Sequence, residues 1–188
     1  MAKALAVLHD SRTVADVVSA GINLNSPRPQ ATPAELRDRF LPLLSRPLIW
    51  RIQELIDWVE SMLSTSPAGR TGDDVLLHGN WHSHNLIFSY GYQQLMGVLD
   101  FEEASIGDRH YDFRYLPSMA STFALLNELI FYYERLANVT LNFDRILAWH
   151  VLTDLGDALW NTEAQRDVAV GPANLRAQEL LFRLGGSF

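Results

Sequence analysis

Two side chains that carry oxygen ligands, Asn85 and Asp100, stand at the ends of short apolar stretches typical of β-strands. Leu86–Phe88 follows Asn85 directly, and Leu95–Leu99 runs into Asp100. If these strands pair, the carboxamide and the carboxylate lie side by side, a ligand set that suits Mg²⁺ and its retained waters. Each residue alone is better explained as a turn residue bonded to the local backbone. Their joint spacing favours the metal site.

Three histidines, His78, His82 and His84, lie close together just before Asn85. Three imidazoles in an open site, with Asp100 nearby, could hold zinc and activate a water molecule for hydrolysis. Loop histidines also make ordinary hydrogen bonds through either ring nitrogen. A zinc-dependent hydrolase that uses these three histidines is therefore one alternative function.

The elements that must position these residues are mostly helical, because apolar residues recur at helical spacing over most of the chain. Thr32, Pro33 and Glu35 form a helix start, with a capping hydroxyl, a proline in the first turn and a glutamate three residues after the cap. Pro47 separates that helix from the next one. Helices are expected at 1–20, 34–45, 47–64, 112–125, 127–138, 142–161 and 172–184.

A short β insert interrupts the helices. Its expected strands are Val75–Leu77, Leu86–Phe88 and Leu95–Leu99, with a loop at 65–73 before them and a turn at 89–93. The predicted fold class is α+β, mostly α-helical, in a single domain over 1–188. Within it, 1–64 is helical, 75–112 is the insert with the chemistry-bearing residues, and 113–188 is helical.

Three motifs in this insert resemble those of one enzyme family. The segment His78-Gly79-Asn80-Trp81-His82-Ser83-His84-Asn85 resembles the catalytic loop H-G-D-x-x-x-x-N of the aminoglycoside phosphotransferase and choline kinase-like family. Gly97-Val98-Leu99-Asp100-Phe101-Glu102 resembles the metal-binding segment that follows it, a variant of the kinase D-F-G motif. Gly107-Asp108-Arg109-His110-Tyr111-Asp112 resembles the family's G-D-P-x-x-D stretch. The three occur in the family's order and spacing.

The resemblance implies the C-terminal lobe of a protein kinase-like phosphotransferase, which moves the γ-phosphoryl of ATP or GTP to a hydroxyl of a small molecule. It implies that Asn85 and Asp100 hold Mg²⁺ against the nucleotide phosphates. By the same resemblance, His78 gives the loop its structure and Asp108 braces the loop from behind. Phosphoryl transfer depends mainly on positioning and charge neutralisation, which agrees with such a site.

The chain departs from this family at Asn80, which occupies the position of the catalytic aspartate. A carboxamide can bond to a hydroxyl but cannot take its proton, and loss of a general base typically costs about 10²–10⁴ in rate. We therefore expect impaired transfer. A non-catalytic kinase-like binding or assembly module is the leading alternative.

The nucleotide-binding N-terminal lobe is also expected to be absent. No P-loop pattern occurs, and the chain's one lysine, Lys3, lies at the front of a helix with no strand before it. We expect such a chain to be a truncated form of a longer enzyme, one half of a two-chain enzyme or a degenerate relative. Its expected partners are a second copy of the chain (a homo-oligomer) or a separate chain that supplies the N-terminal lobe.

Composition narrows the choice of partners. A formal net charge of −7 argues against nucleic-acid binding and slightly favours a cationic acceptor. The absence of cysteine excludes disulfides and thiolate zinc sites. No apolar run is long enough to span a membrane, so no membrane partner is expected, and a cytoplasmic location is predicted.

Overall fold

A computed structural model describes residues 1–64, 74–92, 94–120, 122–164 and 177–182. The chain divides into two compact units. Unit 1 consists of Met1–Pro27 and Ser66–Ile146, and unit 2 consists of Arg28–Thr65 and Leu147–Phe188. The expectation that 1–188 forms a single domain stays a prediction. The expected loop at 65–73 lies outside the described residues.

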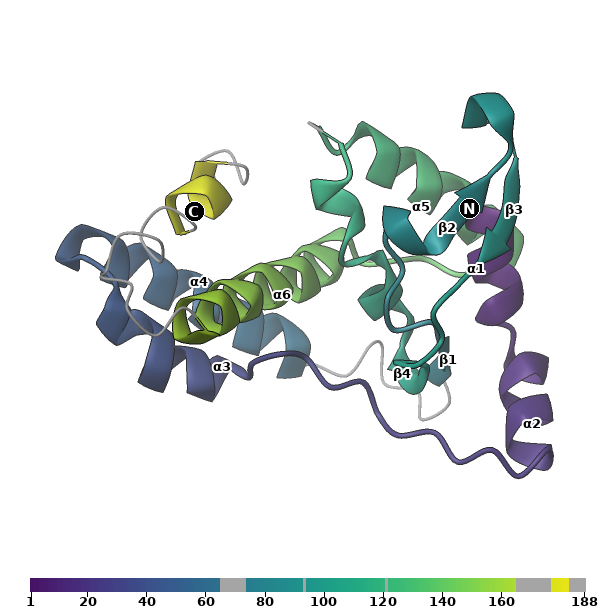
Figure 1. The fold of residues 1–188 in the computed structure, drawn as a ribbon, viewed down its shortest axis with the longest axis horizontal. Helices are drawn as coiled ribbons and strands as arrows, with labels where there is room; N and C mark the ends of the chain where they lie inside the picture. The colour runs from purple at the N-terminus through teal and green to yellow at the C-terminus, as the bar shows by residue number, and fades with distance from the viewer. Residues whose placement is uncertain (65–73, 93, 121, 165–176, 183–188) are drawn as a thin grey trace. The chain divides into compact units, whose positions relative to one another are not determined.

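Unit 1 begins with two helices where the sequence predicted one over 1–20. α1 (Ala2–Leu8) and α2 (Ser11–Ser19) are separated at His9 and Asp10 (Figure 1). Asp10 has an extended backbone and its carboxylate accepts a hydrogen bond from the amide of Arg12 at 2.8 Å, so it caps α2. The single-helix prediction is wrong because this cap starts a new helix in a new direction.

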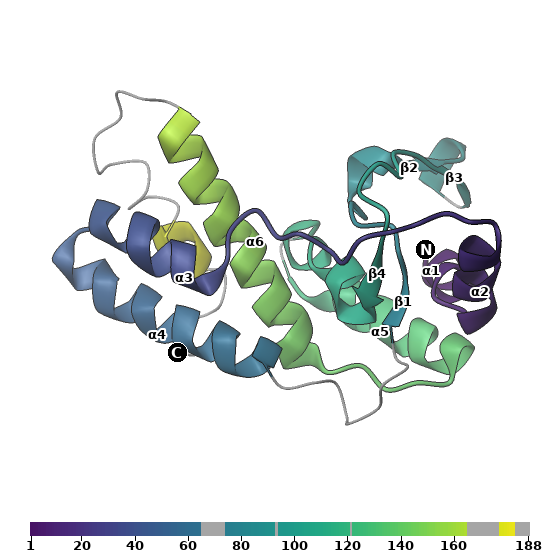
Figure 2. The ribbon, with the colours of Figure 1, turned by 90° about the horizontal axis from the view of Figure 1, so that it is seen from below.

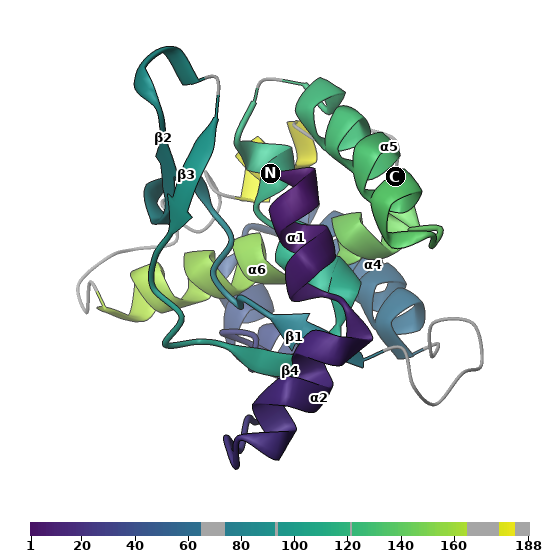
Figure 3. The same ribbon diagram turned by 90° about the vertical axis from the view of Figure 1, so that its right-hand side faces the viewer.

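The rest of the helical part of unit 1 lies after the insert. The sequence predicted a helix over 112–125, but the chain there forms two 3₁₀ turns, η6 (Arg109–Phe113) and η7 (Leu116–Ser118). α5 (Ala124–Ala137) then confirms the helix expected at 127–138, although it begins three residues earlier, and Asn138 ends it in the left-handed conformation, with φ of 52°. Figure 3 shows α1 alongside α5, against which it packs.

Two small antiparallel sheets carry the insert. β2 (Leu86–Phe88) pairs with β3 (Leu95–Val98) through the short turn η5 (Tyr90–Tyr92), and Leu86 lies opposite Val98. β1 (Asp74–Leu77) pairs with a strand that the sequence did not predict, β4 (Ser105–Asp108). The three predicted strands are thus present, and the pairing of β2 with β3 brings the residues just before β2 and just after β3 together.

The core of unit 1 joins helices, strands and the segment between β1 and β2. Its buried apolar side chains are Leu5, Trp81, Leu86, Phe113, Leu116, Leu126, Leu129, Tyr133, Leu141 and Ile146. Trp81 belongs to the segment that resembles a catalytic loop, so the anchoring of that segment is part of the packing of the unit.

Unit 2 is helical. The predicted start signal is present, since Thr32 and Glu35 form a reciprocal capping box at α3 (Pro33–Glu35). One π-helical turn, η1 (Leu36–Phe40), and one 3₁₀ turn, η2 (Leu41–Leu43), follow. α4 (Arg46–Ser64) then begins before Pro47, so this proline lies in the first turn of α4 and does not separate the helices as predicted.

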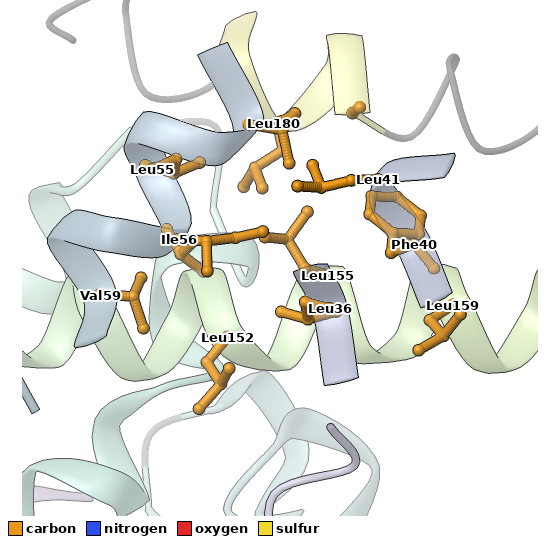
Figure 4. Close-up of a cluster of buried hydrophobic side chains, with 14 of the residues drawn as sticks. Leu36, Phe40, Leu41, Leu55, Ile56, Val59, Leu152, Leu155, Leu159 and Leu180 are labelled. Carbon is orange, nitrogen blue, oxygen red and sulfur yellow. The ribbon is translucent and has the colours of Figure 1, made fainter. Parts of the chain in front are cut away.

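α6 (Phe143–Ala164) completes this unit from Leu147 onward and lies beside α3 and α4 (Figure 2). Buried side chains of α4 recur at helical spacing, at Leu48, Ile52, Leu55, Ile56 and Val59. They pack against a matching stripe on α6 that includes Leu152, Leu155 and Leu159 (Figure 4). The described part of the helix expected at 172–184 is residues 177–182.

Together these elements confirm the predicted mostly helical α+β class. Among the described residues, no helix has the length and apolar character needed to cross a membrane.

Candidate active site

The segment between β1 and β2, residues 78–85, forms a loop whose first residues are held by one buried imidazole. The Nδ1 atom of His78 accepts a hydrogen bond from the amide of Asn80 at 3.1 Å, and its Nε2 atom donates to the carbonyl of Leu99 at 2.8 Å. These roles require the tautomer with the proton on Nε2. His78 therefore ties the 78–85 loop to the segment that follows β3, and the structuring role expected of it stays a prediction.

Asn80, Asn85 and Asp100 form a polar cluster where the loop meets that segment. The side-chain amides of Asn80 and Asn85 both donate to Oδ2 of Asp100, each at 3.3 Å. Asn85 also donates to the main-chain carbonyl of Asn80 at 2.9 Å. Asn85 is buried, whereas Asp100 is exposed. The structure thus brings Asn85 and Asp100 together as their spacing suggested, and it adds Asn80 to them.

Two features of this cluster fit a hard divalent cation. The donor set is a carboxylate and an amide oxygen, and Asn85 uses its nitrogen for Asn80 and Asp100, which leaves Oδ1 as the atom available to a cation. Asp100 has a φ of 64°, a left-handed conformation that non-glycine residues rarely adopt and that recurs at functional sites. Asn85 and Asp100 are therefore the residues that could hold Mg²⁺.

His82 lies on the other side of Asn85, with its Nε2 atom 3.4 Å from the amide nitrogen. Its Nδ1 atom accepts a hydrogen bond from the amide of His84 at 3.2 Å, so the neutral ring carries its proton on Nε2. Burial, followed by the charge of His84, lowers the pKa of His82 below its ordinary value. In this tautomer Nε2 of His82 is a donor, as is the side-chain nitrogen of Asn85, so their approach at 3.4 Å is a packing contact and not a hydrogen bond. Nε2 in this form cannot take a proton from a substrate.

The zinc alternative is not supported by this geometry. Both ring nitrogens of His78 are used by main-chain groups, and the Nδ1 atom of His82 is used by His84. Within the part of the chain that the structure describes, no three histidine or acidic side chains are placed to hold a metal ion. His78, His82 and His84 therefore do not converge on a common point.

The residue that braces the loop is Asp112. Its carboxylate accepts hydrogen bonds from the main-chain amides of His78 at 2.8 Å and Gly79 at 2.9 Å. The sequence interpretation gave this role to Asp108 and is corrected here. Asp108 ends β4 and caps η6, and its carboxylate pairs with His110 and Arg145. Asp112 lies within η6, which contacts β1, and its carboxylate therefore reaches the first residues of the loop after β1.

Asp112 has a further buried partner at the residue that ends α1. Nε2 of His9 lies 3.1 Å from its carboxylate, and Nδ1 of His9 lies 2.8 Å from the hydroxyl of Tyr133. Burial acts to raise the pKa of Asp112, but the hydrogen bond and charge of His9 and the two loop amides outweigh burial and lower it. Asp112 is therefore held as a carboxylate. The one sequence signal for it was its place at the end of the Gly107–Asp112 motif.

The family model described as the phosphotransferase enzyme family (APH) matches residues 1–140. Among curated proteins, the search returned no match.

Two solved structures are similar in fold. One is a macrolide 2′-phosphotransferase type I, with 17% identity and a TM-score of 0.57, covering 94% of this chain and 56% of that chain. The other is a thermostable mutant of the aminoglycoside phosphotransferase APH(4)-Ia in its apo form, with 18% identity and a TM-score of 0.50. That match covers 83% of this chain and 51% of the other. The chain therefore spans about half the length of the structures it matches.

Proposed function

This chain belongs to the phosphotransferase enzyme family, and on that premise we propose that it transfers the γ-phosphoryl of ATP or GTP to a hydroxyl of a small molecule. Asn85 and Asp100 are the proposed ligands of Mg²⁺. The observation that carries the proposal is the cluster of Asn80, Asn85 and Asp100, in which both amides share one carboxylate oxygen. Asn80 lies near the start of the 78–85 loop, Asn85 lies just before β2, and Asp100 follows β3. The three side chains therefore meet only because the chain folds in this way.

The roles of the chain's own residues follow from this geometry. The Oδ1 atom of Asn80 can accept a hydrogen bond from the acceptor hydroxyl and orient it, but it cannot take the proton. In a loose transition state the hydroxyl proton leaves late, to water or to phosphoryl oxygens, so transfer is slowed and not abolished. A bound Mg²⁺ would supply neutralisation of the charge on the transferring phosphoryl oxygens. Asp112 and His78 keep the loop backbone in register with Asp100.

The acceptor we propose is a hydroxyl-bearing cation. Its support is the formal net charge of −7, which attracts cations and disfavours nucleic acid. A cytoplasmic site of action, without a membrane partner, is part of the proposal, and the cysteine-free composition permits it. The matched region makes up only 56% and 51% of the two solved structures, so a second copy or a separate chain that contributes purine contacts is included in the proposal.

Calorimetry of ATP and GTP binding, with and without Mg²⁺, tests this proposal. We expect binding that requires the metal and that is lost in Asp100→Ala. Asp16→Ala, which removes an exposed carboxylate of α2 in the same unit, is the matched control and should bind as the unmodified chain does. Metal-independent binding, or equal binding by both variants, would refute the proposed ligand role of Asp100.

A non-catalytic binding module is the second candidate, and Asn80 is the observation that favours it. Its amide bonds to Asp100 where a proton acceptor is expected for transfer. Under this alternative, nucleotide binds with Mg²⁺ but no labelled phosphate reaches any hydroxyl acceptor, cationic or neutral. Turnover with one acceptor would exclude this candidate, and assays of both kinds on the same preparation separate the two functions.

A further inference from the structure

Arg114, which follows η6, places a buried guanidinium behind the 78–85 loop. The side chain is 2% exposed. Its Nη2 atom donates to the carbonyl of Gly79 at 2.5 Å, and its Nη1 atom donates to the carbonyl of Tyr111 at 3.1 Å. A buried guanidinium must replace its lost hydration with fixed partners. One of the partners found here is a main-chain group inside the loop.

Two aromatic rings complete the surroundings of this cation. The Cζ atom of Arg114 lies 3.7 Å from the ring centre of Tyr111 and 4.2 Å from that of Tyr115. Burial raises the pKa of Tyr111 to about 12, so this ring stays neutral beside the guanidinium. A planar guanidinium can stack on rings while its edge donates hydrogen bonds, whereas the ammonium group of lysine cannot do both.

The carbonyl that Arg114 holds belongs to the peptide that joins Gly79 to Asn80. The amide at the other end of this peptide, that of Asn80, donates to His78. The preceding amide, that of Gly79, donates to Asp112. The carbonyl of Gly79 and the amides of Gly79 and Asn80 are thus each held by a hydrogen bond. The orientation of this peptide sets the direction in which the side chain of Asn80 leaves the backbone.

A second contact runs from Arg114 to the later part of the loop. Its Nη2 atom donates to the hydroxyl of Tyr115 at 3.2 Å, and the ring of Tyr115 meets the ring of His82 edge-on at 5.4 Å. His82 in turn lies against the amide of Asn85. One guanidinium therefore supports the loop at two points, one on each side of Trp81.

We infer that Arg114 is a positioning residue of this site: it holds the Gly79–Asn80 peptide directly and His82 through Tyr115, and so aims Asn80 and Asn85 at Asp100. This positioning role rests on the proposed function, because it presumes a reaction at Asp100. The contacts themselves do not depend on it. Residues that orient metal ligands without touching the metal typically change affinity or activity by about 10–100-fold when they are replaced.

The test uses Arg114→Lys, which keeps the charge but not the stacked fork, and Tyr115→Leu, which removes the ring against His82. For each variant we would measure the NMR signals of the loop amides, their broadening by Mn²⁺ alone, and the free energy of unfolding in urea. Arg135→Lys is the matched control, because Arg135 also lies over a ring, that of Phe131, but on α5.

We expect Arg114→Lys to shift the amides of residues 79–85 selectively and to weaken Mn²⁺ broadening at Asp100 by ~10-fold or more. Tyr115→Leu should shift the His82–Asn85 half alone. The inference is overturned if the loop signals of Arg114→Lys equal those of the unmodified chain. It is also overturned if the shifts spread evenly through unit 1 together with a loss of stability. If the unmodified chain shows no Mn²⁺ broadening and no turnover, the proposed function fails, while the loop amides still decide the role of Arg114.

Discussion

The side-chain amide of Asn80 donates a hydrogen bond to the carboxylate of Asp100 at 3.3 Å. An amide next to a carboxylate is an attractive contact, whereas a second carboxylate there would repel the first. The side chain at residue 80 therefore affects the stability of the cluster when no cation is bound. It also determines whether the cluster can accept a proton from a substrate hydroxyl. This contact between Asn80 and Asp100 would therefore affect the proposed binding of Mg²⁺ at the site.

Asn80→Asp should make folding depend on a divalent cation. Two like charges about 4 Å apart repel by ~1 kcal/mol in water and ~4 kcal/mol at an effective dielectric constant of about 20. We expect the free energy of unfolding to fall by an amount within that range and to be restored by Mg²⁺, measured by urea denaturation. Asn127→Asp on the exposed side of α5 adds the same charge elsewhere and is the control. Equal behaviour of the two variants would contradict the prediction.

The same Asn80→Asp variant should raise the rate of phosphoryl transfer if the chain transfers at all. A restored proton acceptor is typically worth about 10²–10⁴ in rate. The measurement is kcat for an acceptor that the unmodified chain phosphorylates slowly, with KM recorded separately. An unchanged kcat would show that residue 80 does not face the acceptor hydroxyl.

Gly79→Ala should disrupt the loop far more than Gly91→Ala, although the two glycines have nearly the same φ, 80° and 75°. An added Cβ at Gly79 would lie 2.1 Å from the carbonyl oxygen of Glu103, whereas at Gly91 nothing lies within 4 Å. Gly91→Ala should cost ~1–2 kcal/mol for the left-handed backbone alone. Gly79→Ala should add ~1–3 kcal/mol of overpacking. Urea unfolding of both variants provides the comparison, and equal losses would contradict the close approach.

Acidification should destabilise the protein through His82. Its pKa lies below the ordinary 6.5, first because of burial and then because of the charge of His84. Between the folded and unfolded pKa values the unfolded chain binds more protons, so the free energy of unfolding rises with pH through this window. His82→Gln should reduce that slope, and His84→Gln should move the NMR titration midpoint of His82 upward. A midpoint above 6.5 in the unmodified chain would refute the prediction.

Ile56→Ala should destabilise unit 2 by ~2–5 kcal/mol, because it opens a cavity between α4 and α6. Ile56 is 0% exposed. Trp50→Ala removes a larger side chain from the same helix, but Trp50 is 75% exposed, so the expected change is within about 0.5 kcal/mol. Thermal unfolding followed by circular dichroism measures both. A larger loss for Trp50→Ala would show that this face of α4 is covered in solution.

The predicted elements were right where local patterns decide structure. The capping box of Thr32 and Glu35 and the strands on either side of Asn85 and Asp100 follow from short-range chemistry, and all are present. The break at Asp10 was missed because apolar spacing continued across it, although an aspartate can cap a new helix. β4 was missed because its sequence, Ser105–Asp108, has no alternating apolar pattern and is a strand through its pairing with β1.

The sequence by itself determined the mostly helical α+β class, the order of the three motifs and the amide at residue 80, because these depend on residue types and on neighbours along the chain. Only the tertiary structure decided that Asp112 and not Asp108 holds the loop, that Arg114 lies behind it, and that the three histidines do not converge. The physical reason is that these contacts join segments far apart in the chain, and their partners are selected by the packing of α1, the strands and α5 around the loop.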